Sequence, residues 1–172
     1  MTLHAKVQKI KALVLDIDGV LTDGRIGYGQ GEGEIKFFHV RDGHGLKMAM
    51  RAGLKVGVLS GRSSEANRTR ARELGFSFIY EGKKDKGEAF KILLAENDLK
   101  ADECLYMGDD VVDIPVFRQA GIAVTVADAP ADLDEFCDCR TKLPGGQGAV
   151  RELIEWLLKE QGKWQDLMKK YI

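Results

Sequence analysis

The sequence has 172 residues, 44% of them apolar, which is enough to fill the core of about one domain. Its formal net charge of −1 leaves no broad basic surface for nucleic acid or an anionic membrane, and its apolar runs are shorter than the roughly 20 residues that span a bilayer. The three cysteines form no C-x-x-C pair, which predicts reduced thiols in a cytoplasmic protein.

Predicted strands and helices alternate along most of the chain. Short branched apolar runs predict strands at residues 11–16, 54–59, 76–80, 103–107 and 122–126. Helices are predicted at 45–52, 63–74, 86–96, 111–119 and about 149–161. Residues 24–40 are expected to form a hairpin insertion, with strands at 25–28 and 34–40 and a glycine-rich tip at 29–33. This order predicts an α/β fold in one domain, residues 1–172, with a Rossmann-like, doubly wound parallel sheet.

Polar residues gather where the predicted strands end. Asp16 and Asp18 close the first strand and, two residues apart on extended backbone, point the same way. Ser60 follows the second strand, Asp109 follows the fourth, and Lys86 opens the helix after the third. Each motif alone is also typical of a turn or a helix cap. Because ligands bind beyond the carboxyl ends of parallel strands, their joint occurrence predicts one site.

This set of side chains indicates phosphate chemistry with a hard cation. Carboxylate oxygens suit Mg²⁺, which would reduce the repulsion between a carboxylate nucleophile and a dianionic phosphate. A phosphoaspartate would then divide one very slow displacement into two easier ones.

The motifs resemble the haloacid dehalogenase superfamily over nearly the whole chain. They are D-x-D-G-V-L at residues 16–21, L-S-G-R at 59–62, Lys86, and G-D-D-x-x-D at 108–113. The resemblance implies that Asp16 is the nucleophile and Asp18 the acid/base. It also implies that Ser60 and Lys86 bind the transferred phosphoryl group.

The same resemblance implies a magnesium site and its supporting residues. The ligands would be the Asp16 side chain, the Asp18 backbone carbonyl and the Asp109 side chain. Asp110 is expected to orient Lys86 or a metal-bound water, and Asp113 to support the metal shell.

Two further motifs resemble a capless subgroup, the 3-deoxy-D-manno-octulosonate 8-phosphate phosphatases of lipopolysaccharide precursor synthesis. They are V-R-D-G at 40–43 and G-G-Q-G-A-V-R-E at 145–152, and the short spacing before Ser60 leaves no room for a large cap domain. The resemblance implies a homotetramer whose subunits complete each other's active sites, with a C-terminal helix and tail at about 147–172. It names as candidates for substrate contact His39, Val40, Arg41, Asp42, Gly43, Lys47, Arg62, Arg70 and Lys86.

The sequence departs from the subgroup pattern at three positions. His39 stands where Asn is common, Lys47 where Arg is common, and Gln147 where the glycine-rich motif often carries Arg. The last of these departures argues against a contact between the tail and the substrate. A phosphatase of a nine-carbon sialic-acid-type sugar phosphate is the alternative. An inactive scaffold is a second alternative, but it would have lost part of the acidic set, whereas Asp16, Asp18 and Asp109 are all present. A phosphate-binding receiver needs a long-lived phosphoaspartate, which an acid/base at Asp18 disfavours.

Overall fold

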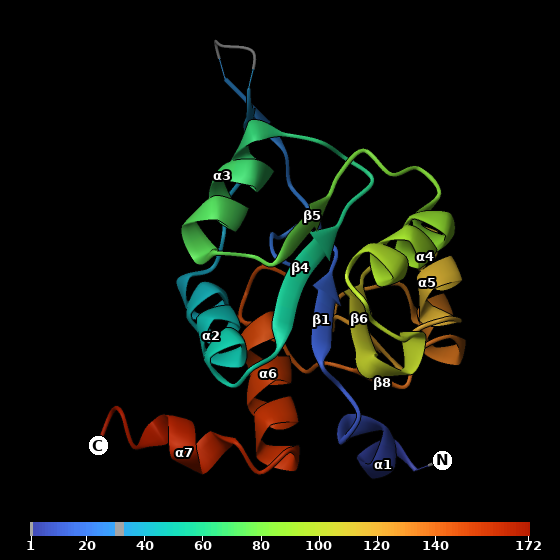
Figure 1. Cartoon of the computed structure of the whole chain (residues 1–172). Coiled ribbons are helices and arrows are strands. Elements are labelled where there is room, and N and C mark those ends of the chain that lie inside the picture. Colours follow the sequence, from blue (N-terminus) through green and yellow to red (C-terminus); the bar gives the residue numbers. More distant parts are fainter. Residues whose placement is uncertain (1, 30–32) are drawn as a thin grey trace.

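The computed structural model describes residues 2–29 and 33–172. Its main feature is a six-stranded sheet in the order β5-β4-β1-β6-β7-β8, with every pairing parallel (Figure 1). The strands are β1 Ala12–Leu15, β4 Lys55–Leu59, β5 Phe78–Tyr80, β6 Cys104–Gly108, β7 Ile122–Thr125 and β8 Cys139–Arg140. The predicted doubly wound α/β fold is confirmed, and β8, too short for a sequence signal, is an addition.

Helices cover both faces of this sheet because β1 sends alternate side chains to opposite sides. Leu13 and Leu15 join the core cluster on one face, and Ala12 and Val14 join the cluster on the other. The first face is covered by α1 (Leu3–Val7), α2 (Val40–Arg51), α3 (Glu65–Leu74) and α6 (Ala149–Glu160), and the second by α4 (Lys86–Glu96) and α5 (Ile114–Phe117). Burial on both faces explains the near-continuous apolar runs in the sequence.

Helix α2 begins five residues before the predicted start at residue 45. The prediction was wrong because Gly43 and Gly45, poor helix formers, lie inside the helix. A Cβ at Gly43 would collide with the Arg70 guanidinium of α3, and one at Gly45 would lie 3.0 Å from Arg151 Cδ of α6. The close packing of α2 against α3 and α6 therefore favours glycine at both positions.

The helix predicted at 111–119 is divided. It consists of a 3₁₀ turn, Val111–Asp113, followed by α5, Ile114–Phe117. Pro115 has no N–H to donate back to residue 111, so a continuous α-helix cannot form there. The chain closes with α7 (Trp164–Met168), which was not predicted, and the Tyr171 hydroxyl beyond it contacts His44 and Arg51 of α2.

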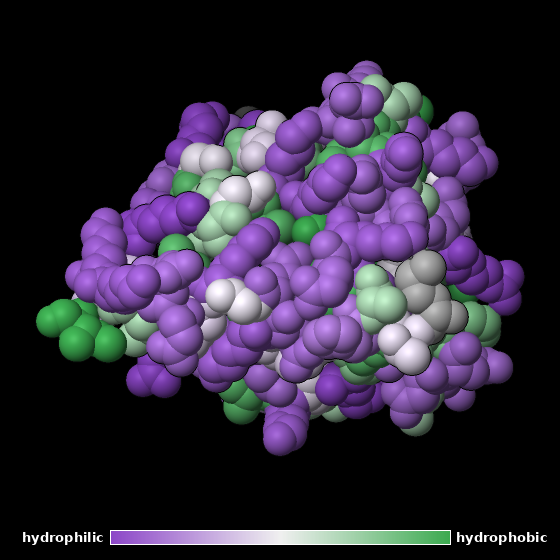
Figure 2. Space-filling model, turned by 60° about the horizontal axis from the view of Figure 1, so that its bottom comes forward, coloured by the Kyte–Doolittle hydropathy of each residue, from purple (hydrophilic) through white to green (hydrophobic). Residues whose placement is uncertain are grey.

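The hairpin insertion lies beyond the carboxyl ends of the strands, and both termini lie at the opposite end (Figure 1). Its antiparallel strands are β2 (Gly27–Tyr28) and β3 (Glu34–Ile35), so the second is shorter than the predicted 34–40. Of the predicted tip at 29–33, residues 30–32 lie outside the described residues. At the end with the termini, hydrophobic residues form small groups among hydrophilic ones (Figure 2). Among the described residues, every helix is too short or too polar to cross a membrane.

Candidate active site

The register of the sheet brings the ends of three strands together. Leu15 of β1 pairs with Val58 of β4 on one side and with Met107 of β6 on the other. The residues that follow these strands therefore emerge next to one another. They line one cavity of about 200 Å³, together with Lys86 from α4, and its lining residues are Asp16, Asp18, Ser60, Gly61, Arg62, Lys86, Asp109, Asp110 and Val112.

A buried ion pair lies at the bottom of this cavity. Lys86 Nζ is 2.7 Å from Asp16 Oδ2 and 2.6 Å from Asp113 Oδ1. Burial raises the pKa of Asp16 to about 6, although Lys86 opposes the shift. Burial lowers the pKa of Lys86, but the charges of Asp16 and Asp113 outweigh this and raise it overall. Lys86 therefore remains a cation beside the Asp16 carboxylate.

Asp113 organises the loop after β6. Its Oδ1 accepts hydrogen bonds from Lys86 Nζ and from the Tyr106 hydroxyl, at 2.6 and 2.5 Å. Its Oδ2 accepts the backbone N–H groups of Asp109 and Asp110, at 3.0 and 3.2 Å. Asp113, not Asp110, therefore orients Lys86, and the Asp110 carboxylate accepts the N–H of Val111. The other expectation, that Asp110 orients a metal-bound water, stays a prediction.

The carboxylates fit a divalent cation. Oxygen atoms of Asp16, Asp109 and Asp113 lie within 4.8 Å of one another. Burial and the negative charges of Asp16 and Asp113 raise the pKa of Asp109 to about 8, although Lys86 opposes the shift, so the three carboxylates outnumber the one cation that contacts them. Asp113 is fully buried and does not line the cavity, whereas Asp16 and Asp109 do, so these two are the side chains that a metal in the cavity can reach. An all-oxygen set of this kind suits Mg²⁺.

Asp18 is held by a residue that the sequence analysis missed. Lys36, just after β3, places Nζ 2.6 Å from Asp18 Oδ1 and 3.5 Å from Glu34 Oε2. Glu34 in turn pairs with Arg62. The available signal was alternation, because Glu34 and Lys36 share one face of the hairpin strand and Ile35 and Phe37 the other.

The C-terminal glycine motif packs against the loop that carries the two aspartates. Gly146 N–H donates to the Val20 carbonyl at 2.9 Å. A Cβ at Gly145 would overlap the carbonyl oxygen of Gly19. A Cβ at Gly19, on its other side, would overlap the Asp109 carboxylate. The motif therefore supports the backbone around Asp18 within its own chain.

Only two of the predicted substrate contacts, Arg62 and Lys86, line the cavity at Asp16. His39 and Arg41 line a separate cavity of about 560 Å³ that also includes Gln147. Val40 is 81% exposed, and Lys47 lies in the middle of α2.

Three further candidates have structural partners instead. Asp42 is buried, and its Oδ1 accepts the N–H of Arg151 at 2.7 Å, so it caps the start of α6 from α2. Burial raises the pKa of Asp42. Gly43 makes room for Arg70, which pairs with Glu73 and lies over the ring of Phe38.

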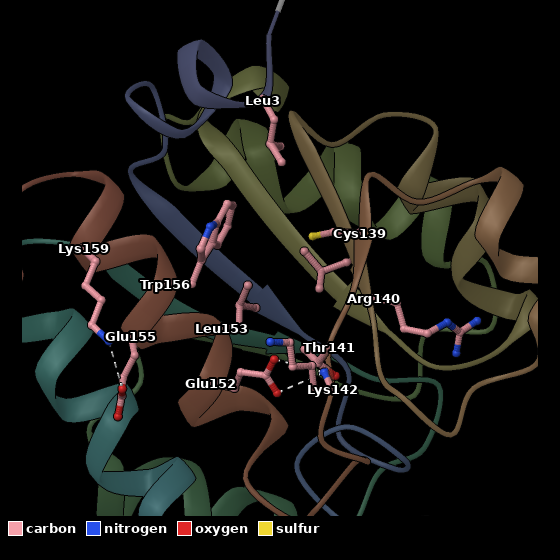
Figure 3. A pocket seen from close by; sticks show the side chains of 11 residues that line it. Leu3, Cys139, Arg140, Thr141, Lys142, Glu152, Leu153, Glu155, Trp156 and Lys159 are labelled. Carbon is pink, nitrogen blue, oxygen red and sulfur yellow. Dashed lines mark hydrogen bonds and ion pairs between the residues drawn. The ribbon is translucent and has the colours of Figure 1, made fainter.

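A cavity of about 470 Å³ lies apart from the acidic cluster, between α6 and the strands β7 and β8 (Figure 3). Leu153 and Trp156 contribute apolar surface. The acids at its rim are already partnered, because Glu152 accepts the N–H groups of Lys142 and Leu143 and Glu155 pairs with Lys159. The cluster of four aspartates that lines the first cavity has no counterpart among the residues that line this one.

The parallel sheet and its acidic cluster define a hydrolase of the haloacid dehalogenase-like class, and the family model with that description matches residues 43–121. Two curated relatives are the 3-deoxy-D-manno-octulosonate 8-phosphate phosphatases KdsC of Escherichia coli (strain K12) and Haemophilus influenzae. They are 40% and 42% identical over 92% and 94% of this chain, and the matches cover 85% and 89% of theirs. The chain therefore belongs to the family of 3-deoxy-D-manno-octulosonate 8-phosphate phosphatases.

Solved structures agree with this assignment. The phosphatase of Moraxella catarrhalis, in complex with magnesium, phosphate and a KDO molecule, has a TM-score of 0.94 and 35% identity over 98% of this chain and 97% of its own. The cobalt-bound form of the Haemophilus influenzae phosphatase has a TM-score of 0.88 and 43% identity over 92% of this chain and 93% of its own.

Proposed function

We propose that this chain hydrolyses 3-deoxy-D-manno-octulosonate 8-phosphate to the free sugar acid and inorganic phosphate, a step of lipopolysaccharide precursor synthesis. The observation that carries the proposal is the buried Asp16–Lys86 pair beside Asp109, at the carboxyl end of the central strand. The substrate of the curated relatives supports the choice of sugar acid.

Asp16 is the proposed nucleophile. Its Oδ1 accepts the N–H of Ile17 at 2.7 Å, which orients the carboxylate toward the cavity. Lys86 Nζ and the Ser60 hydroxyl line the same cavity and would hold the phosphoryl oxygens during transfer. Magnesium, held by the Asp16 and Asp109 carboxylates and the Asp18 backbone carbonyl, would supply neutralisation of charge between carboxylate and phosphate.

Asp18 is the proposed acid/base. In the first half-reaction it protonates the leaving sugar oxygen as Asp16 takes the phosphoryl group, and in the second it removes a proton from the attacking water. Both aspartates lie on one short loop and line the same cavity, so the aspartyl phosphate can be formed and hydrolysed at one site.

We also propose a homotetramer in which neighbouring subunits complete the site. A cavity of about 200 Å³ is smaller than the roughly 300–1,000 Å³ of typical ligand pockets, so one chain encloses only the phosphoryl end of such a substrate. Tyr28 and Phe37 of the hairpin are 78% and 74% exposed, and exposed apolar side chains of this size are typical of subunit contacts. His39 and Arg41 are then candidates for contacts across a subunit boundary. The free cysteines support a cytoplasmic enzyme.

The test is phosphate release from a panel of eight-carbon, nine-carbon and ordinary sugar phosphates, with magnesium and then with EDTA. We expect magnesium-dependent preference for 3-deoxy-D-manno-octulosonate 8-phosphate, and no release by Asp16→Asn. Better turnover of a nine-carbon acid would keep the mechanism and change the substrate. Sedimentation at the assay concentration tests assembly, and an active monomer would contradict the tetramer.

A further inference from the structure

Lys36 is a fully buried cation outside the acidic cluster at Asp16. Its side chain is 0% exposed, although it comes from a two-stranded hairpin at the edge of the molecule. Removing an ammonium group from water is costly unless carboxylates compensate for it. Here Asp18 and Glu34 do so, at 2.6 and 3.5 Å.

The charges around Lys36 are connected by ion pairs. Glu34 is shared between Lys36 and Arg62, and Arg62 lines the cavity at Asp16. Two carboxylates and two cations therefore form a row, from Arg62 after β4, through Glu34 and Lys36 of the hairpin, to Asp18 after β1. This row holds the Lys36 ammonium in place from both sides, so Asp18 meets a partner that is itself fixed.

The contact distinguishes the two oxygens of Asp18. Oδ1 accepts a hydrogen bond from Lys36 Nζ at 2.6 Å. Oδ2 is buried and has no hydrogen-bond partner within the described residues, while Asp18 lines the cavity at Asp16. A buried carboxylate oxygen without a partner is unfavourable unless a ligand or water uses it.

We propose that Lys36 is the positioning residue of the acid/base: it fixes Asp18 by Oδ1, so that Oδ2 gives its proton to the leaving oxygen and later takes one from water. The proposal rests on the function proposed above and deepens it. In the first half-reaction the proton moves from Oδ2 to the sugar oxygen as the P–O bond breaks, and the carboxylate that remains is stabilised by the Lys36 charge. In the second, water attacks phosphorus as the bond to the Asp16 oxygen breaks, and the water gives one proton to Oδ2, which leaves inorganic phosphate and a free Asp16 carboxylate.

This assignment makes a prediction about leaving groups. A sugar alkoxide is a poor leaving group and needs a proton, whereas p-nitrophenolate leaves without one. General acid catalysis contributes about 10²–10⁴-fold in rate, so loss of a correctly placed Asp18 affects the sugar phosphate selectively. Only kcat/KM isolates this first half-reaction, because kcat also includes hydrolysis of the aspartyl phosphate.

The experiment compares wild type, Lys36→Met and the exposed control Lys91→Met on the preferred sugar phosphate and on p-nitrophenyl phosphate. For Lys36→Met we expect kcat/KM on the sugar phosphate to fall by about 10²-fold. On the aryl phosphate kcat/KM should change little, while kcat and KM fall together because the second half-reaction still needs the base. Lys91→Met should match wild type on both substrates.

A merely structural role would lower kcat/KM equally on both substrates, and that result would overturn the proposal, as would an unchanged kcat/KM on the sugar phosphate. Retained aryl-phosphate turnover shows that the variant is folded. If Lys36→Met does not fold, Lys36→Gln, which is neutral and polar, takes the same test. A wild type that prefers another sugar phosphate overturns the substrate but leaves Lys36 testable on that compound. A wild type that hydrolyses aryl but no alkyl phosphates overturns both proposals.

Discussion

Gly145→Ala tests whether the C-terminal glycine motif positions the catalytic loop. The new Cβ would lie 1.7 Å from the Gly19 carbonyl oxygen, and Cβ contacts below 3.0 Å essentially do not occur, so the two backbones must separate by about 1.3 Å. Gly19 directly follows Asp18, so the acid/base moves with the loop. A displacement of about 1 Å at a reacting group costs about 10²-fold in rate, and we expect kcat to fall by about that factor.

The assay is steady-state phosphate release under saturating magnesium, with thermal unfolding measured in parallel. Gly33→Ala is the matched control, because a Cβ at that glycine would meet no described residue within 4 Å, and it should behave as wild type. We expect Gly145→Ala to lose about 1–3 kcal/mol of unfolding free energy through overpacking and still fold. A folded Gly145→Ala variant with wild-type kcat would refute the positioning role of the motif.

Three further predictions concern individual carboxylates. Asp16→Asn should lower kcat by about 10⁴-fold or more while circular dichroism shows an intact fold, and retained activity would exclude Asp16 as the nucleophile. Because the raised pKa of Asp109, about 8, lies above that of an unfolded chain, the metal-free folded state binds the extra proton, and its stability falls as pH rises between about 4 and 8. Magnesium should therefore raise Tm more at about pH 8 than at about pH 5. Each pKa unit is worth about 1.4 kcal/mol, or about 3–6 °C in a domain of this size, and equal increases at the two pH values would contradict this. Asp42→Ala removes the cap of α6 and should cost about 1 kcal/mol in urea unfolding with KM unchanged, whereas a raised KM would instead support a substrate contact.

Residues that follow buried strands were the most predictable part of the site. Asp16, Ser60 and Asp109 each come directly after an apolar run, and a parallel sheet must bring such ends to one edge. Contacts between segments far apart in sequence were not predictable. Lys36 and Asp18 are 18 residues apart, and the sequence alone does not show which face of the hairpin turns inward.

The different roles of Asp110 and Asp113 show that residue type and spacing alone do not identify the carboxylate that contacts Lys86. Both follow β6, and a helical reading of the segment would direct either toward Lys86. Pro115 interrupts the helix, and the resulting 3₁₀ turn points Asp113 inward, while Asp110 caps the turn.

The sequence by itself determined the alternation of strands and helices, the acidic residues at the strand ends, and thereby the parallel α/β fold and the chemistry it supports. These features depend on local periodicity and on the geometry that every parallel sheet shares. Only the tertiary structure decided that Lys36 holds Asp18, that Asp42 caps α6, and that Gly145 lies against Gly19. Such contacts arise where separate segments pack to the density of a protein interior, and neighbours in sequence do not encode which distant surface fills that space.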